Sequence, residues 1–334
     1  MNARSPKPIP RSVAIFGASG HIGGPLARYL RFHAPDIKLR LIATSSAKAE
    51  SLRQAYPGAE VVQASYLDGP SLNAAMADIE GVFVLTSEPT EEAPAMTNLV
   101  AAVRKADRLI HMIRIVGMQP YRNDRRLPQA LLDYPLGIEI QHPIACRILD
   151  EADIPVTYLN VFASYMDNLL RTIPDILETG TLYWPERQMT YVDPREVGEA
   201  AARLLLSDDV RHLYQFYTLN SGERQLGSGE IAQMMSEVFQ RNIAWDGSLD
   251  AVMRTFAKPV ELGLISVEYV TYLREYFGFM ADIDHQWVPN QFLERTLGRQ
   301  PTTMRAWLQE HRRFFFPDDS PHLPVGVSVA QRHG

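Results

Sequence analysis

A short apolar segment runs directly into three closely spaced glycines, Gly17, Gly20 and Gly23, and an amphipathic stretch at 25–32 follows at once. Glycine at such points permits a tight turn, close approach of backbone amides to a pyrophosphate, and helix packing without an intervening side chain. The anion would also lie at a helix N-terminus, where the helix dipole favours negative charge. An ordinary turn between strand and helix is the alternative, but both flanking segments favour a dinucleotide-binding βαβ unit. The predicted contacts in this loop are Gly17, Ser19, Gly20, His21, Ile22 and Gly23.

Apolar segments alternate with helical patterns through the first half of the chain, as a parallel, doubly wound α/β sheet requires. The predicted strands are 13–16, 39–44, 60–63, 81–86, 110–116 and 156–161. The predicted helices between them are 24–32, 47–55, 72–77, 93–105 and 143–152. The binding crevice of such a sheet lies at the carboxyl ends of the strands. Residues that directly follow each strand are therefore the candidates for ligand contact.

The pattern changes after residue 162, where longer helices are predicted at 196–206, 228–239, 249–256, 267–277 and 302–315. We predict a flexible N-terminal tail at 1–11, a dinucleotide-binding domain at 12–162, a smaller and mostly helical substrate-binding part at 163–316, and an arm or disordered tail at 317–334. Two later segments, near 189–192 and 214–219, are predicted to be strands that return to the main sheet.

Composition limits the kinds of partner. The 334 residues include 33 basic and 39 acidic side chains, and this net charge of −6 argues against a broad nucleic-acid surface. One cysteine cannot form an internal disulfide, and no His/Cys group has the spacing of a zinc site, so no metal is predicted. No segment approaches the roughly 18 apolar residues of a membrane span, and the polar start lacks a signal-peptide core. We predict a cytoplasmic protein with a small-molecule substrate and no nucleic-acid or membrane partner, and leave a homodimer open.

The segment after the second predicted strand bears on the type of dinucleotide. For NAD, a carboxylate about 20 residues past the glycines would bind the ribose hydroxyls, and none stands there. The strand ends instead in Thr44, Ser45 and Ser46, followed by Lys48. Hydroxyls and an ammonium group bind a 2′-phosphate, which favours NADP over NAD. A hydroxyl-rich turn that caps the next helix at Ser45 or Ser46 is the alternative, and the two interpretations are compatible.

Five segments resemble the NmrA-like branch of the atypical short-chain dehydrogenase/reductases. Residues 17–23 are similar to its GxxGxxG loop, 64–72 to its GDxxDxxSL turn, and 81–86 to its GvdavFlvt strand. Residues 142–168 resemble its HxxxExxLxxSGxxxTxLRPxxFMxN segment. Residues 288–314 resemble its vTxxxxxxTGRxPxxfxxfxxxhxxxF ending, with Thr296, Gly298, Arg299 and Pro301 in place. The resemblance covers about residues 12–316 and implies an extended Rossmann fold that binds NAD(P).

The Ser/Tyr/Lys set with which the wider superfamily reduces carbonyls is not visible here. No tyrosine stands four residues before a lysine, Val116 stands where a serine would end the strand, and His142 stands in the place of the lysine. Pro143 occupies what reads as the first helical position, so His142 is predicted to cap this helix. A helix N-terminus lowers a histidine's pKa and leaves a neutral imidazole that donates one hydrogen bond to a ribose hydroxyl or a substrate oxygen. A capping histidine without chemistry is the alternative.

The remaining candidates follow the later strands. The predicted dinucleotide contacts are Ser65, Thr86, Ser87, Gly117 and His142, and the predicted substrate contacts are Met118, Asn160, Tyr165 and Asn168. Tyr165 is the best available phenolic proton donor and joins His142 as a predicted catalytic residue; an aromatic wedged between sheet and helical part is the alternative. Core packing is the alternative for Met118, and Cys146 is predicted to be a small buried residue rather than a nucleophile. The aromatic stretch at 269–287 suits an apolar substrate pocket or a dimer surface, with core packing as the alternative.

We predict an NADP-dependent oxidoreductase that moves hydride to or from a medium-sized, largely apolar substrate with a carbonyl, an imine or a conjugated double bond. An activated acceptor is attractive because it needs less protonation than a ketone when the Tyr/Lys pair is absent. One alternative is a non-catalytic NADP(H)-binding redox sensor, which needs the glycine loop but no proton donor. A redox-neutral isomerase or lyase with a bound dinucleotide is a second alternative.

Overall fold

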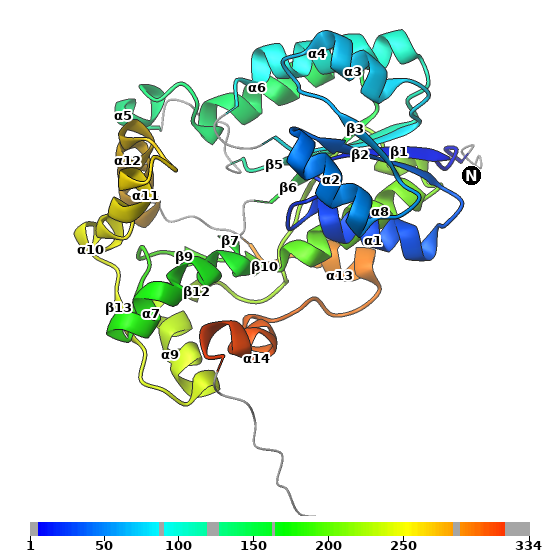
Figure 1. Ribbon diagram of the computed structural model, residues 1–334. Helices are drawn as coiled ribbons and strands as arrows, with labels where there is room; N and C mark the ends of the chain where they lie inside the picture. The colour runs from blue at the N-terminus through cyan, green and yellow to red at the C-terminus, as the bar shows by residue number, and fades with distance from the viewer. Residues whose placement is uncertain (1–5, 87–89, 119–126, 162–163, 283–287, 318–334) are drawn as a thin grey trace, which may run out of the picture.

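The computed structural model describes residues 6–86, 90–118, 127–161, 164–282 and 288–317. Its larger lobe holds a seven-stranded sheet in which every neighbouring pair is parallel, with the order β11-β6-β5-β4-β1-β2-β3 (Figure 1). The strands are β1 (Ser12–Phe16), β2 (Lys38–Ala43), β3 (Glu60–Gln63), β4 (Gly81–Val84), β5 (His111–Val116), β6 (Val156–Asn160) and β11 (Gln215–Thr218). The predicted α/β fold class and the six predicted strands of the first half are confirmed. The order reverses between β1 and β4, and sheets of this kind bind ligands at that reversal.

Helices cover both faces of the sheet, which explains why its strands read as apolar runs. One face carries α1 (Gly23–His33), α2 (Ser46–Ala55) and α8 (Pro194–Leu206). The other carries α3 (Gly69–Met76), α4 (Glu92–Ala106) and α6 (Ile138–Glu151) (Figure 1). Every residue of β5 is buried between the two layers. A charged side chain in that strand therefore requires a partner in the core.

A smaller lobe holds a third apolar core, in which Phe239, Trp307 and Phe315 are fully buried. It is built from η2 (Met166–Thr172), α7 (Ile173–Thr179), β8 (Thr181–Tyr183), β9 (Gln188–Met189), β12 (Leu226–Gly227), α9 (Ser228–Phe239), β13 (Ala244–Asp246) and α14 (Met304–Phe315). Of three further helices, α12 (Val267–Asp282) lies beside α5 (Gln129–Leu132) and α10 (Leu249–Arg254) packs against α12, while α11 (Ala257–Glu261) follows α10 in the chain (Figure 1). Within the part of the chain that the structure describes, no helix is both long enough and apolar enough to cross a membrane.

Two predictions on chain organisation need correction. β11 joins the main sheet beside β6 as predicted, but the segment near 189–192 does not. It forms two short strands instead: β9 pairs with β12, and β10 (Tyr191–Val192) pairs with β7 (Ser164–Tyr165). Residues 6–11 are not a loose tail, because Lys7 is buried and its amide and ammonium groups donate to the carbonyl oxygens of Asp208 and Leu205 at 2.8 and 3.3 Å.

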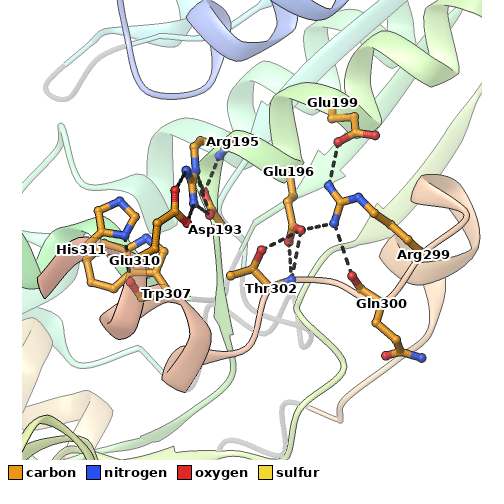
Figure 2. A network of polar contacts seen from close by, with 10 residues as sticks. All are labelled: Asp193, Arg195, Glu196, Glu199, Arg299, Gln300, Thr302, Trp307, Glu310 and His311. Atoms are coloured by element: carbon orange, nitrogen blue, oxygen red, sulfur yellow. Dashed lines mark hydrogen bonds and ion pairs between the residues drawn. The ribbon is translucent and has the colours of Figure 1, made fainter. Parts of the chain in front are cut away.

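A polar network joins α8 to the C-terminal segment (Figure 2). The buried Glu196 accepts hydrogen bonds from the Arg299 guanidinium at 2.5 Å and from the Thr302 amide at 3.0 Å. Arg195 lies between the buried Asp193 and Glu310 of α14, at 2.6 and 2.5 Å. The segment from Thr296 to Pro301, which carries part of the family resemblance, therefore fastens α13 (Phe292–Leu297) and α14 to the Rossmann lobe rather than lining a ligand site.

Candidate functional site

The glycine loop between β1 and α1 is tightly folded. Gly17 has a φ of +71°, a region that favours glycine, and its carbonyl oxygen accepts from the amide of Gly20 at 2.9 Å. A Cβ atom at Gly23, the first residue of α1, would overlap the same carbonyl oxygen. Ile22 stands at the N-cap position and offers no side-chain oxygen to the first turn. The loop therefore has the compact backbone, and a helix terminus without a side-chain cap, that suit a pyrophosphate.

The end of β2 serves two purposes at once. Ser45 caps α2, because its hydroxyl accepts from the Lys48 amide at 3.3 Å. Lys48 also places its ammonium group 3.3 Å from the Thr44 hydroxyl, and both side chains are exposed. Ser46 donates to Gln63 at 3.2 Å. The capping interpretation is thus observed at Ser45, while Thr44 and Lys48 together leave a hydroxyl and a positive charge beside the strand end.

A cavity of about 890 Å³ lies at the carboxyl ends of β4, β5 and β6. Seven of the predicted site residues line it: His21, Ile22, Thr86, Gly117, His142, Tyr165 and Asn168. The opposite wall comes from the start of α6, from the segment before α12, and from three tyrosines, Tyr134, Tyr269 and Tyr276. Part of the aromatic stretch therefore faces this cavity, whereas Tyr272 is buried and donates to Glu139 at 2.7 Å. The cavity joins the glycine loop, the strand ends and the smaller lobe in a single space.

His142 reaches this cavity from a different position than predicted. α6 begins at Ile138, with Gly137 as its N-cap, so His142 lies in the second turn and Pro143 lies inside the helix. The prediction that His142 caps the helix is therefore wrong. Its Nδ1 atom lies 2.8 Å from the Gly117 amide nitrogen and 3.2 Å from the Gly117 carbonyl oxygen. The shorter contact, to a group that only donates, favours the tautomer in which Nδ1 accepts and Nε2 carries the proton. No described residue pairs with Nε2, which leaves one donor for a ligand in the cavity.

The neutral state predicted for His142 has another cause than a helix terminus. Burial, together with the positive charge of Arg114, lowers the pKa of His142 from 6.5 to about 3. Charging this ring would require desolvation beside an existing cation, which is unfavourable. The side chain is therefore uncharged at physiological pH and is able to donate one hydrogen bond to a ligand.

Acid is expected to weaken the fold through a second histidine, His111 in β5. Burial lowers the pKa of His111 from 6.5 to about 3, and its ring lies 2.7 Å from the Thr157 hydroxyl. Between about pH 3 and about pH 6.5, His111 binds a proton in the unfolded chain but not in the folded chain. The free energy of unfolding therefore falls as the pH falls. At about pH 5 this one group is expected to reduce it by about 2 kcal/mol.

Urea unfolding of the wild type and of His111→Gln at about pH 7 and about pH 5 measures this effect. The variant is expected to lose about 2 kcal/mol less than the wild type between the two conditions, because it removes the group that titrates. His33→Gln, a change at an exposed histidine, is expected to keep the wild-type difference. Equal losses in the wild type and His111→Gln would contradict the assignment.

Two predicted substrate contacts prove to be structural. Asn160 is buried, accepts from the Met118 amide at 2.7 Å and donates to the Met118 carbonyl oxygen at 3.1 Å. This pair of bonds fastens β6 to the chain that leaves β5, so the Asn160 amide is directed at the backbone and not at the cavity. Met118 is itself buried, 3.6 Å from the sulfur of Cys146, and Cys146 is fully buried as predicted. The prediction that Asn160 and Met118 bind substrate is corrected accordingly.

A buried ion pair lies beneath Thr86. Arg114 of β5 and Glu92 of α4 are both almost wholly inaccessible, and Nη2 of the arginine lies 2.5 Å from Oε1 of the glutamate. Nη2 also donates to the Thr86 hydroxyl at 2.8 Å, and Thr86 donates to Glu92. The Glu92 amide donates to Gln141 of α6 at 2.7 Å. The cluster therefore joins the end of β4 to β5, α4 and α6 directly beside the cavity.

The other predicted contacts have separate surroundings. Tyr165 lies against the His21 ring with centroids 4.9 Å apart, and His21 pairs with Asp167 at 2.7 Å, which joins the glycine loop to η2. Ser65 is exposed and accepts from the Leu67 amide within its own turn. Ser87 lies outside the described residues.

Four charged residues near the cavity were not singled out from sequence: Glu92, Arg114, Arg171 and Arg187. A signal existed for one of them, because Arg114 interrupts an apolar run predicted to be a buried strand and so required an acidic partner. No local sequence pattern identifies the partner, Glu92, which lies 22 positions earlier on a helix. Arg171 and Arg187 lie in the smaller lobe, and local sequence patterns do not predict how this lobe packs over the edge of the sheet.

Comparison with known proteins gives the family. The sequence profile of the NmrA-like family matches residues 10–308. The chain belongs to the NmrA-like family. It is 26% identical over 314 residues to the (4-alkanoyl-5-oxo-2,5-dihydrofuran-3-yl)methyl phosphate reductase of Streptomyces griseus subsp. griseus, an alignment that covers 92% of this chain and 100% of the relative. The predicted family resemblance is thereby confirmed.

Solved structures of two relatives have the same fold. The NADPH-dependent quinone oxidoreductase of Escherichia coli in complex with NADPH superimposes with a TM-score of 0.71 at 21% identity, covering 90% of this chain and 99% of that one. NmrA, a negative transcriptional regulator, in complex with NADP superimposes with a TM-score of 0.65 at 15% identity, covering 92% and 95%. The same fold thus belongs to an enzyme and to a regulator, so the function of this chain must be argued from the residues of its site.

Proposed function

We propose that this NmrA-like protein is an NADP-dependent reductase that moves hydride between NADPH and a medium-sized organic substrate with a carbonyl, an imine or a conjugated double bond. The observation that carries the proposal is the shared cavity, in which residues of the glycine loop and the neutral donor of His142 meet. The reductase from Streptomyces griseus, which this chain matches over its whole length, supports the same class of activity. Its name describes a conjugated lactone, which supports a conjugated acceptor here.

The residues at two positions fit NADP. The glycine loop would hold the pyrophosphate, because its tight turn, in which a Cβ atom at Gly23 would overlap the Gly17 carbonyl, ends directly at the N-terminus of α1. Thr44 and Lys48 would hold the 2′-phosphate, since the segment between them has no carboxylate to repel it. NADPH, when bound, supplies the hydride.

The protein's own contribution is to position and polarise the acceptor. His142 would donate its Nε2 proton in a hydrogen bond to the substrate oxygen and so stabilise the negative charge that develops there. Tyr165 and Asn168, on the wall that the smaller lobe supplies, would orient the substrate. The apolar side chains of Val116, Val161 and Ile138 would exclude water from the reacting centre.

A redox sensor is the second candidate, and the likeness to the regulator NmrA favours keeping it. Such a protein would bind the dinucleotide through the same loop and use the smaller lobe to contact a protein partner. The redox-neutral isomerase or lyase has no observation that favours it. A cytoplasmic location and a homodimer remain predictions from sequence.

Calorimetric titration with NADPH, NADP⁺, NADH and NAD⁺, followed by a screen of NADPH oxidation with enones, quinones, imines and ketones, tests the proposal. NADPH is expected to bind at least about tenfold more tightly than NADH, and Lys48→Gln is expected to remove most of that preference. Gly20→Asp is expected to abolish binding, because it adds a carboxylate beside the pyrophosphate site. Lys258→Gln, at an exposed lysine of α11, serves as the control.

The outcomes separate the candidates. Oxidation of NADPH that depends on one acceptor class supports the reductase. Tight binding with a strong preference for one redox state and no oxidation supports the sensor. Absence of dinucleotide binding overturns both.

A further inference from the structure

Among the residues that the structure describes, those that line the cavity with a permanent charge all have the same sign. Among the described lining residues there are two arginines, Arg171 and Arg187, and neither aspartate nor glutamate. The histidine at the strand ends, His142, is held neutral. The whole chain carries a net charge of −6, so a cavity with only cationic charge departs from the average surface of this protein.

Arg187 is held in place by ring faces rather than by an acid. Its guanidinium carbon lies 5.7 Å from the centroid of Trp184 and 5.9 Å from that of Phe277. Nη2 donates to the Ser164 hydroxyl at 3.4 Å, and the buried Nε has no acceptor among the described residues. Stacking of this kind fixes the guanidinium plane and leaves its charge and several N–H groups unpaired.

Neither cavity arginine forms an ion pair with a described residue. Elsewhere Arg40, Arg195 and Arg299 each lie within 2.8 Å of a carboxylate. Two acids lie four positions from Arg171 in the sequence. Asp167 is paired with His21 at 2.7 Å, and Asp175 forms no ion pair with Arg171. Arg187 is partly buried and Arg171 is exposed, so a ligand in the cavity can supply the negative charge that the described residues do not.

Most of the remaining lining is apolar or aromatic and includes Ile138, Met189, Leu264, Ile265, Tyr134 and Tyr269. Such a wall binds a carbon skeleton. Arg187 and Ser164 belong to the smaller-lobe side, whereas Gly117 and His142 belong to the strand ends, where the reacting group is proposed to lie. The cavity thus offers an apolar middle between a cationic side and a neutral hydrogen-bond donor.

We propose that the substrate carries an anionic group, a phosphate monoester or a carboxylate, that binds to the guanidinium of Arg187 with Ser164 and Arg171 beside it. The inference rests on the proposed function, because it assigns the part of the cavity that the dinucleotide leaves for the substrate. A planar guanidinium presents paired N–H groups to the oxygens of either anion. The substrate is accordingly amphiphilic rather than wholly apolar as predicted from sequence.

Binding to the NADP⁺-saturated protein tests this without turnover. Phenyl phosphate, benzoate and benzyl alcohol are titrated by calorimetry; the stronger of the two anions identifies the group. One anion is expected to bind at least about tenfold more tightly than the alcohol, and Arg187→Gln is expected to remove about tenfold or more of that affinity. Arg187→Lys should recover part of it because the charge remains. Arg254→Gln, at an exposed arginine of α10, should match the wild type.

NADPH affinity, measured on every variant, separates this inference from the proposed function. It is expected to stay within about twofold of wild type in Arg187→Gln, which also shows that the variant is folded. Absence of binding by both anions, equal binding of anion and alcohol, or unchanged anion affinity in Arg187→Gln would each overturn the inference. A loss of NADPH affinity in Arg187→Gln would overturn it too, because the arginine would then serve the dinucleotide. Failure of the wild type to bind any dinucleotide would instead overturn the proposed function.

Discussion

Replacing Arg114 with methionine is expected to lower the free energy of unfolding by about 3–5 kcal/mol. The substitution keeps the apolar stem of the side chain but removes the charge that faces Glu92 at 2.5 Å, and both residues are buried. The glutamate is then left charged in the core, with the Thr86 hydroxyl as its remaining side-chain donor. Equilibrium unfolding in urea measures the loss.

A double variant and an exposed pair supply the controls. Arg114→Met combined with Glu92→Leu removes both charges and is expected to be less destabilising than Arg114→Met alone, because no isolated charge remains. Arg53→Gln breaks an exposed pair with Glu50 and is expected to cost under about 0.5 kcal/mol. If Arg114→Met lowered the free energy of unfolding no more than Arg53→Gln, the Arg114–Glu92 pair would not stabilise the structure around the site.

The Rossmann lobe was predictable because its determinants are local. An apolar strand, a glycine turn and an amphipathic helix recur within short windows, and β1 with its loop and α1 is recognisable from these alone. Short strands such as β9 and β10 have no such advantage. A strand of two residues is too short for its hydrophobic pattern to predict which strand it pairs with. The pairing of β9 and β10 in small separate sheets therefore depends on tertiary packing.

The site was only partly predictable for a related reason. Strand ends meet at one edge of the sheet, and this rule was enough to bring Thr86 and Gly117 together, whereas His142 was singled out through the family resemblance. The rule that proline occupies the first turn of a helix misplaced the start of α6, where Pro143 lies in the interior. Arg187 could not be predicted at all, because its role depends on how a distant lobe folds over the sheet edge.

His142→Phe is expected to lower kcat/KM for NADPH oxidation by about 10²- to 10³-fold, the usual cost of one lost donor to a developing oxyanion. Phenylalanine keeps an aromatic ring of similar size but has neither the Nε2 donor nor the Nδ1 acceptor for Gly117. NADPH affinity is expected to change by about twofold at most, since the proposed contact is to the substrate oxygen. Steady-state kinetics with the acceptor found in the screen, together with calorimetry, measure both.

The pH profile and a second variant separate this role from simple packing. Because the pKa of His142 is lowered to about 3, the plot of wild-type kcat/KM against pH should show no change near pH 6.5 that arises from His142. A histidine that acted in its charged form would produce such a change. His142→Gln retains an amide N–H donor and is expected to recover part of the activity that His142→Phe loses. If both variants lost activity together with NADPH affinity and unfolding stability, His142 would be a packing residue. Wild-type turnover in His142→Phe would assign the donor role to another group in the cavity.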